Sequence, residues 1–76
     1  MTTEMAPRIV VDPSVRFGKP VIEGTCVPVD LIVGKLTGGM TSEELALEYG
    51  ISVDDVLAAL AYAANVLAEQ ELRVTA

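Results

Sequence analysis

The segment from Val56 to Ala68 constrains the fold of this chain more than any other, because it favours a helix and is almost entirely apolar. No Gly or Pro interrupts residues 53–72, so the sequence predicts a helix of about 20 residues and roughly 30 Å. Asn65 is the only fully polar side chain between Val56 and Ala68, which leaves the helix without a solvated face. A helix that is apolar on every side is normally a buried helix.

A chain of 76 residues is too small to surround such a helix. Two short helices and a β-ribbon can cover one side of it, so the rest is expected to contact another protein surface. The alanine pairs at 58–59 and 63–64 would let two such helices approach closely. In the alternative interpretation, the helix is merely rich in alanine, and its alanine side chains are exposed at little cost. The residues predicted to form a dimer or partner interface are Leu57, Leu60, Tyr62, Ala64, Val66 and Leu67.

Capping residues define the two helices in the second half of the chain. Thr41 and Glu44 have the spacing of a capping box, and the helix that they begin is expected to end at Gly50. Ser52 and Asp55 begin the long helix in a similar way. Two helices that meet at a glycine with this spacing indicate a helix-turn-helix unit.

The first half of the chain contains two extended runs and one short helix. Residues 8–12 and 21–27 are rich in β-branched side chains and are expected to pair as a ribbon, either within one chain or across a dimer. Pro28 suits the first turn of a helix, which is expected to end at Gly38.

These elements predict a mainly α fold, a three-helix helix-turn-helix-like domain with a short N-terminal β-ribbon that forms a dimer. We expect residues 1–8 to be a flexible N-terminus, residues 9–72 to form the single domain, and residues 73–76 to form a C-terminal tail.

Charge is distributed unevenly along the chain, whose net charge is −6. Residues 1–35 contain as many cations as acids, whereas Arg73 is the only cation among seven acids in residues 36–76. Any surface that binds an anion must therefore lie in the N-terminal half. Asp54 and Asp55 stand where a DNA-reading helix would present cationic or amide side chains, so direct reading of the major groove is not expected. The predicted contacts to a nucleic-acid backbone are Arg8, Arg16 and Lys19.

The residues needed for catalysis or metal binding are missing from this composition. The chain has no His and one Cys, so neither a disulfide within the chain nor a zinc site of the usual kind can form. Cys26 has no adjacent base to activate it and is expected to be a partly buried apolar filler. Gly18-Lys19-Pro20 lacks the spacing of a phosphate-binding loop. We therefore expect no enzyme activity, no metal and no cofactor.

The same sequence gives an expectation about location. The N-terminal residues lack the pattern of a signal peptide, and no apolar run reaches the roughly 18 residues of a membrane span. A cytoplasmic protein without a membrane partner is therefore expected.

A recognisable motif surrounds the "GKPVIEGT" run. Residues 9 to about 62 resemble a bacterial family, domain of unknown function 433, which is grouped with VapB-type antitoxins. Phe17 stands where that family commonly has Gly, and Glu23 and Cys26 stand where it commonly has Arg. The matching positions are Ile9, Asp12-Pro13, Gly18-Lys19-Pro20, Ile22, Gly24-Thr25, Pro28-Val29, Gly39, Ser42-Glu43-Glu44, Tyr49-Gly50 and Asp54-Asp55.

The resemblance implies a small dimeric protein, the antitoxin of a type II toxin-antitoxin system. Such a protein would bind and neutralise a PIN-like ribonuclease toxin and help to repress the shared promoter by binding its DNA. The alternative is a dimeric protein-protein interaction module that does not bind DNA.

Overall fold

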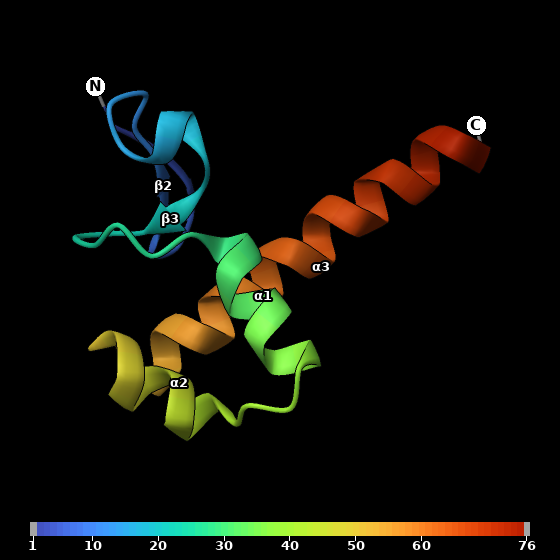
Figure 1. Cartoon of the computed structure of the whole chain (residues 1–76). Helices are drawn as coiled ribbons and strands as arrows, with labels where there is room; N and C mark the ends of the chain where they lie inside the picture. The colour runs from blue at the N-terminus through green and yellow to red at the C-terminus, as the bar shows by residue number, and fades with distance from the viewer. Residues whose placement is uncertain (1, 76) are drawn as a thin grey trace.

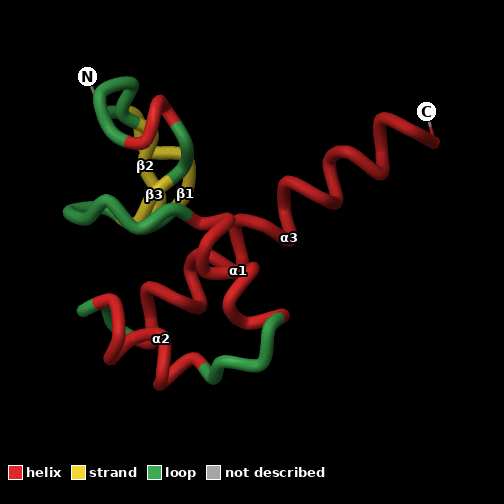
Figure 2. Tube along the Cα trace, in the orientation of Figure 1, coloured by secondary structure: helices red, strands yellow, loops and turns green. Residues whose placement is uncertain are grey.

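The computed structural model describes residues 2–75, with side chains to residue 70. It contains three helices and a small three-stranded antiparallel sheet (Figures 1 and 2). The sheet lies at one end of the molecule, α1 lies in the centre, and the C-terminal half of α3 extends away from both. The mainly α architecture with an N-terminal ribbon is confirmed.

The sheet is formed by β1 (Thr3–Ala6), β2 (Ile9–Val11) and β3 (Val21–Ile22), in that order. Ile9 pairs with Ile22, so the two predicted extended runs pair within one chain. β1 is a strand that the sequence analysis did not predict, since it assigned residues 1–8 to a flexible N-terminus.

The second extended run is shorter than predicted. β3 ends at Ile22, and the chain turns back through Gly24, whose φ is 80°. The Thr25 hydroxyl donates a hydrogen bond of 2.8 Å to the Ile22 carbonyl, and the Ile22 amide donates one of 3.0 Å to the Val27 carbonyl. Residues 21–27 therefore form a tight reversal and not one continuous strand.

Helix α1 (Val29–Thr37) begins after Pro28 and ends before Gly38, as predicted. Helix α2 (Ser42–Tyr49) begins with the predicted capping box. In that box the Thr41 amide donates to Glu44 Oε1 at 2.9 Å, and the Glu44 amide donates to Thr41 Oγ1 at 3.1 Å.

Gly50 ends α2 in the left-handed conformation, with φ of 68°. α3 (Val53–Thr75) begins directly afterwards, and the α2–α3 pair bends by 113° at the break. Because the helix continues to Thr75, most of the predicted tail at 73–76 is helical, and Ala76 lies outside the described residues.

The core lies where the sheet, α1 and α2 meet the first half of α3. Val56 and Ala59 are the buried residues of α3 within its described side chains. The long helix is therefore buried along one face of its first half, and its other described apolar side chains are exposed or partly exposed. The buried core cluster contains Ile9, Ile22, Val29, Ile32, Leu45, Ile51, Val56 and Ala59.

Among the described residues, no single helix is both long and apolar enough to cross a membrane. Helices α2 and α3 meet such a criterion as a pair, across their 113° bend.

Candidate protein-binding surface

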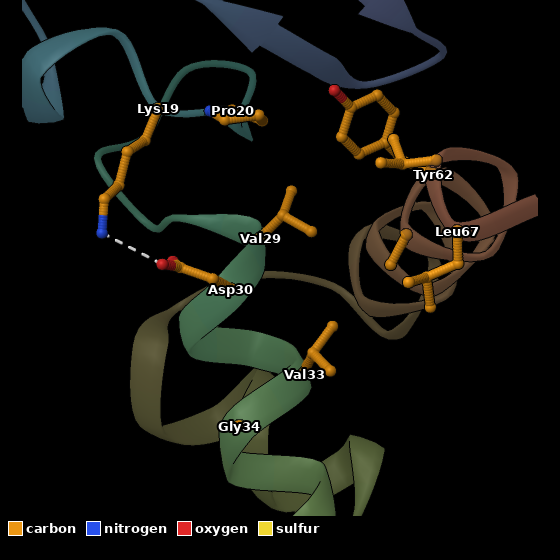
Figure 3. Close-up of a pocket in the computed structure, with 10 residues that line it drawn as sticks. Lys19, Pro20, Val29, Asp30, Val33, Gly34, Tyr62 and Leu67 are labelled. Atoms are coloured by element: carbon orange, nitrogen blue, oxygen red, sulfur yellow. Dashed lines mark hydrogen bonds and ion pairs between the residues drawn. The ribbon is translucent and has the colours of Figure 1, made fainter. Parts of the chain in front are cut away.

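An open apolar groove of about 550 Å³ separates α1 from the middle of α3. Val29 and Val33 approach it from α1, and Tyr62 and Leu67 approach it from α3 (Figure 3). Gly34 contributes no side chain to the α1 wall, and a Cβ atom built there would have no neighbour within 4 Å outside the backbone of its own helix. The α1 wall of the groove is therefore made of small and medium side chains, and the α3 wall adds the larger Tyr62 and Leu67.

One ion pair lies at the edge of this groove. Lys19 Nζ lies 3.0 Å from Asp30 Oδ2, and both side chains are more than half exposed (Figure 3). The hydrogen bond from Lys19 lowers the pKa of the Asp30 carboxyl below its ordinary value. Because these two charged groups bind each other, the groove has few polar groups left to bind those of a ligand.

A second apolar surface runs along the outer side of α3. Leu57, Leu60 and Leu67 are 53%, 37% and 61% exposed, and Ala64 between them is also exposed. We call these four residues the outer strip. They recur at helical spacing, so they form one continuous band along α3.

The predicted interface residues therefore fall on two adjoining faces. Tyr62 and Val66 are partly buried and line the groove, whereas Leu57, Leu60 and Ala64 belong to the outer strip. Leu67 belongs to both. That these residues contact another protein surface stays a prediction.

Arg8 lies in the turn between β1 and β2 and points to the start of α3. Its Nη1 atom donates to Asp55 Oδ1 at 2.9 Å and to Ser52 Oγ at 3.4 Å. Its Nη2 atom lies 3.9 Å from Asp54 Oδ2. This predicted DNA contact therefore binds the acids that begin α3.

Asp55 and Ser52 also form the predicted reciprocal cap of α3. The Ser52 amide donates to Asp55 Oδ2 at 3.1 Å, and the Asp55 amide donates to Ser52 Oγ at 3.0 Å. Partial burial acts to raise the pKa of Asp55, but the hydrogen bonds from Ser52 and Arg8 outweigh it, so the pKa is lowered. The carboxylate is thus held in its charged form.

The turn η1 (Arg16–Gly18) has an unusual backbone. Arg16, Phe17 and Gly18 have φ values of 51°, 57° and 83°. This left-handed conformation costs a residue other than Gly roughly 1–2 kcal/mol. Arg16 Nε donates to the Cys26 carbonyl at 3.1 Å, which fixes the turn to the following loop.

Two side chains in this region are exposed. Phe17 is fully exposed, at 102%, although it is the only Phe in the chain. Cys26 is exposed as well, so its predicted role as a partly buried filler is wrong. The family commonly has glycine at the position of Phe17, and glycine favours the left-handed conformation, so this position was the sequence signal that could have identified the turn.

The three predicted DNA contacts do not form one free cationic patch. Arg8 binds α3, Lys19 binds Asp30, and Arg16 binds a backbone carbonyl. Each cation thus already has a partner within the chain. In the described part of the chain, no group of three His, Cys, Asp or Glu side chains lies close enough together to hold a metal ion.

Comparison with known proteins supports the family resemblance. The crystal structure of Rv2018 from Mycobacterium tuberculosis is similar, with a TM-score of 0.63 and 36% sequence identity. The similar region covers 68% of this chain and 24% of Rv2018, so the matched part of this chain spans about a quarter of the length of that protein. No match was found among curated proteins. Residues 9–63 match the family described as protein of unknown function DUF433, and the chain belongs to that family.

Proposed function

We propose that this chain is a protein-binding module, the antitoxin-like member of a toxin-antitoxin pair, that binds and neutralises a PIN-like ribonuclease. The observation that carries the protein-binding part is the outer strip of α3. Three leucines at helical spacing stay exposed there, although a small chain gains stability by burying such side chains. Insertion of apolar side chains of a helix into the groove of a partner is a common mode of recognition.

The identity of the partner rests on the motif between Ile9 and Asp55 and on its resemblance to VapB-type antitoxins. The arrangement of the cations favours a contact with protein over one with DNA, because all three predicted DNA contacts are engaged within the chain.

Co-expression with the product of an adjacent PIN-like reading frame tests this proposal. The two proteins should copurify, and the complex should cleave RNA more slowly than the nuclease alone. Leu60→Asp places a charge in the outer strip and should abolish both effects. Leu47→Asp is the matched control, because Leu47 is 88% exposed and lies on α2, outside the outer strip. Equal loss in both variants, or full binding by Leu60→Asp, would contradict a role for the outer strip.

We also propose that the chain forms a homodimer. The homodimer is supported by the amount of apolar surface on α3, because no other described part of the chain covers the groove or the outer strip. Light scattering at micromolar concentration, without any partner, should give twice the monomer mass. A mass equal to that of the monomer would rule out the homodimer.

Autoregulation by DNA binding is the second candidate function. The 113° bend between α2 and α3, at a three-residue turn beginning with Gly50, lies within the range of about 90–120° for helix-turn-helix motifs. Asp54 and Asp55 argue against DNA binding, because they occupy the start of the helix that would enter the major groove. Promoter DNA should be titrated at low and raised salt. Binding that weakens steeply with salt and is lost in Arg16→Ala or Lys19→Ala would support this function.

A further inference from the structure

Phe17 combines backbone strain with complete exposure. Its φ and ψ of 57° and 32° lie in the left-handed region, and its side chain is 102% exposed. An exposed aromatic ring contributes no packing to its own fold, and a Gly would fit the same backbone without strain. Strained residues that the fold does not need occur most often at functional sites.

The α1–α3 groove is an open site with no occupant within the described chain. Small-molecule sites normally contain several converging polar groups that orient the ligand. The charged residues that line this groove are Lys19 and Asp30, which bind each other at 3.0 Å. Its remaining lining is largely aliphatic or aromatic, which suits an apolar side chain from a protein.

The chain exposes more surface than a compact monomer of its mass would. The accessible surface is 5074 Å², whereas a compact monomer of this mass exposes about 4,450 Å². The excess of about 600 Å² approaches the roughly 800 Å² that each partner buries in a standard interface.

The charges around the groove permit contact between two copies. Each copy carries a net charge of −6, so contact through the acidic α2 would be repulsive. The lining of the groove contains one cation and one acid, Lys19 and Asp30, so the lining itself carries no net charge. The groove lining of one copy therefore does not repel a neutral side chain of a second copy.

We propose that two copies of this chain exchange their Phe17 side chains, so that Phe17 of each copy occupies the α1–α3 groove of the other. Phe17 precedes the groove-lining Lys19 by two residues, so the turn that carries the exposed ring leads directly into the lining of the groove. A two-fold axis through such a surface makes both contacts in a single closed interface. This inference rests on the proposed homodimer and adds the residue that enters the groove.

Two variants test the contact from opposite sides. Phe17→Gly removes the ring and relieves the left-handed strain, so it should keep or raise the melting temperature. Gly34→Leu places a side chain in the groove, and its Cβ would meet no atom of its own chain within 4 Å. Each variant should weaken dimerisation at least about tenfold, as expected for loss of a central aromatic anchor. Leu47→Ala removes an exposed apolar side chain elsewhere and should leave the dimer unchanged.

Mixing the two variants gives a further test. A Phe17→Gly copy retains an open groove, and a Gly34→Leu copy retains the ring that fills it. The mixture should therefore form a heterodimer with one of the two contacts and associate more tightly than either variant alone.

A Phe17→Trp variant reports the contact directly, because the natural chain contains no Trp. Its fluorescence should shift to shorter wavelength as the concentration is raised through the range of dimerisation measured by sedimentation. Gly34→Leu in the same background should abolish that shift.

The outcomes separate this inference from the proposed homodimer. The exchange is overturned, and the homodimer left standing, if Phe17→Gly leaves the dissociation constant of the dimer unchanged. The same conclusion follows if the emission of the dimeric Phe17→Trp variant stays that of an exposed indole. A wild-type chain that remains monomeric overturns both proposals.

Discussion

Arg8 Nη1 lies 2.9 Å from Asp55 Oδ1 and joins the β1–β2 turn to the first turn of α3 across 47 positions of the sequence. Arg8 holds a left-handed backbone, with φ of 68°, while its carbonyl accepts a hydrogen bond of 2.8 Å from the Glu23 amide. One residue thus connects the turn, the chain after β3 and α3. It holds the sheet against the helical part of the molecule.

We expect Arg8→Ala to lower the free energy of unfolding by about 0.5–1 kcal/mol, because the side chain is half exposed and exposed ion pairs contribute little. Urea denaturation of Arg8→Ala, Asp55→Ala and the double variant gives the coupling energy between the two side chains. Strictly additive effects would mean that the pair does not contribute to stability.

Stability should decrease at acid pH. The pKa values of Asp12, Asp30 and Asp55 are lowered in the folded chain, by hydrogen bonds from Ser14, Lys19 and, for Asp55 against the effect of partial burial, from Ser52 and Arg8. The folded state therefore binds fewer protons than the unfolded state, and the stabilisation is complete above the unfolded pKa of about 3.9. Thermal unfolding from pH 6 to pH 2 should show a loss that begins near pH 4 and continues below it. Asp55→Asn should reduce this dependence, and an unchanged profile would contradict the contribution of Asp55.

The two leucines of α2 should respond differently to truncation. Leu45 is fully buried, whereas Leu47 is 88% exposed. Leu45→Ala should lower the free energy of unfolding by about 2–5 kcal/mol, because it removes buried atoms and leaves a cavity. Leu47→Ala should change it by no more than about 0.5 kcal/mol. Denaturant titration of the two variants measures the difference, and similar values would contradict the packing of α2 described above.

Gly34→Ala should stabilise the chain. Gly34 lies inside α1, and its added Cβ would meet no atom within 4 Å. Alanine is favoured over glycine in a helix interior by about 1 kcal/mol, which corresponds to roughly 4–8 °C in a domain of this size. A melting temperature below that of the wild type would indicate that the groove does not tolerate a methyl group.

The helices were predictable because their ends depend on residues only a few positions apart. The capping boxes at Thr41–Glu44 and Ser52–Asp55 and the left-handed Gly50 all occur as the sequence indicates. β1 was not predicted, because its first three residues are exposed, and its pairing with β2 supplies the signal that its own composition lacks.

The interface prediction was limited in a different way. Periodicity showed that α3 has more apolar surface than the chain can cover, but it could not assign Tyr62 and Val66 to one face and Leu57 to another. That division depends on where α1 lies against α3, which is a relationship between segments distant in the sequence.

The sequence by itself determined the three helices, their caps and the excess of apolar surface on α3, because each depends on composition and local spacing. The tertiary structure decided how the charges are paired, since Arg8 reaches Asp55 and Lys19 reaches Asp30 through the packing of the sheet and α1. It also decided the exposure of Phe17, because the left-handed turn and its bond to the Cys26 carbonyl direct that ring away from the core. Local spacing contains no information about such long-range contacts.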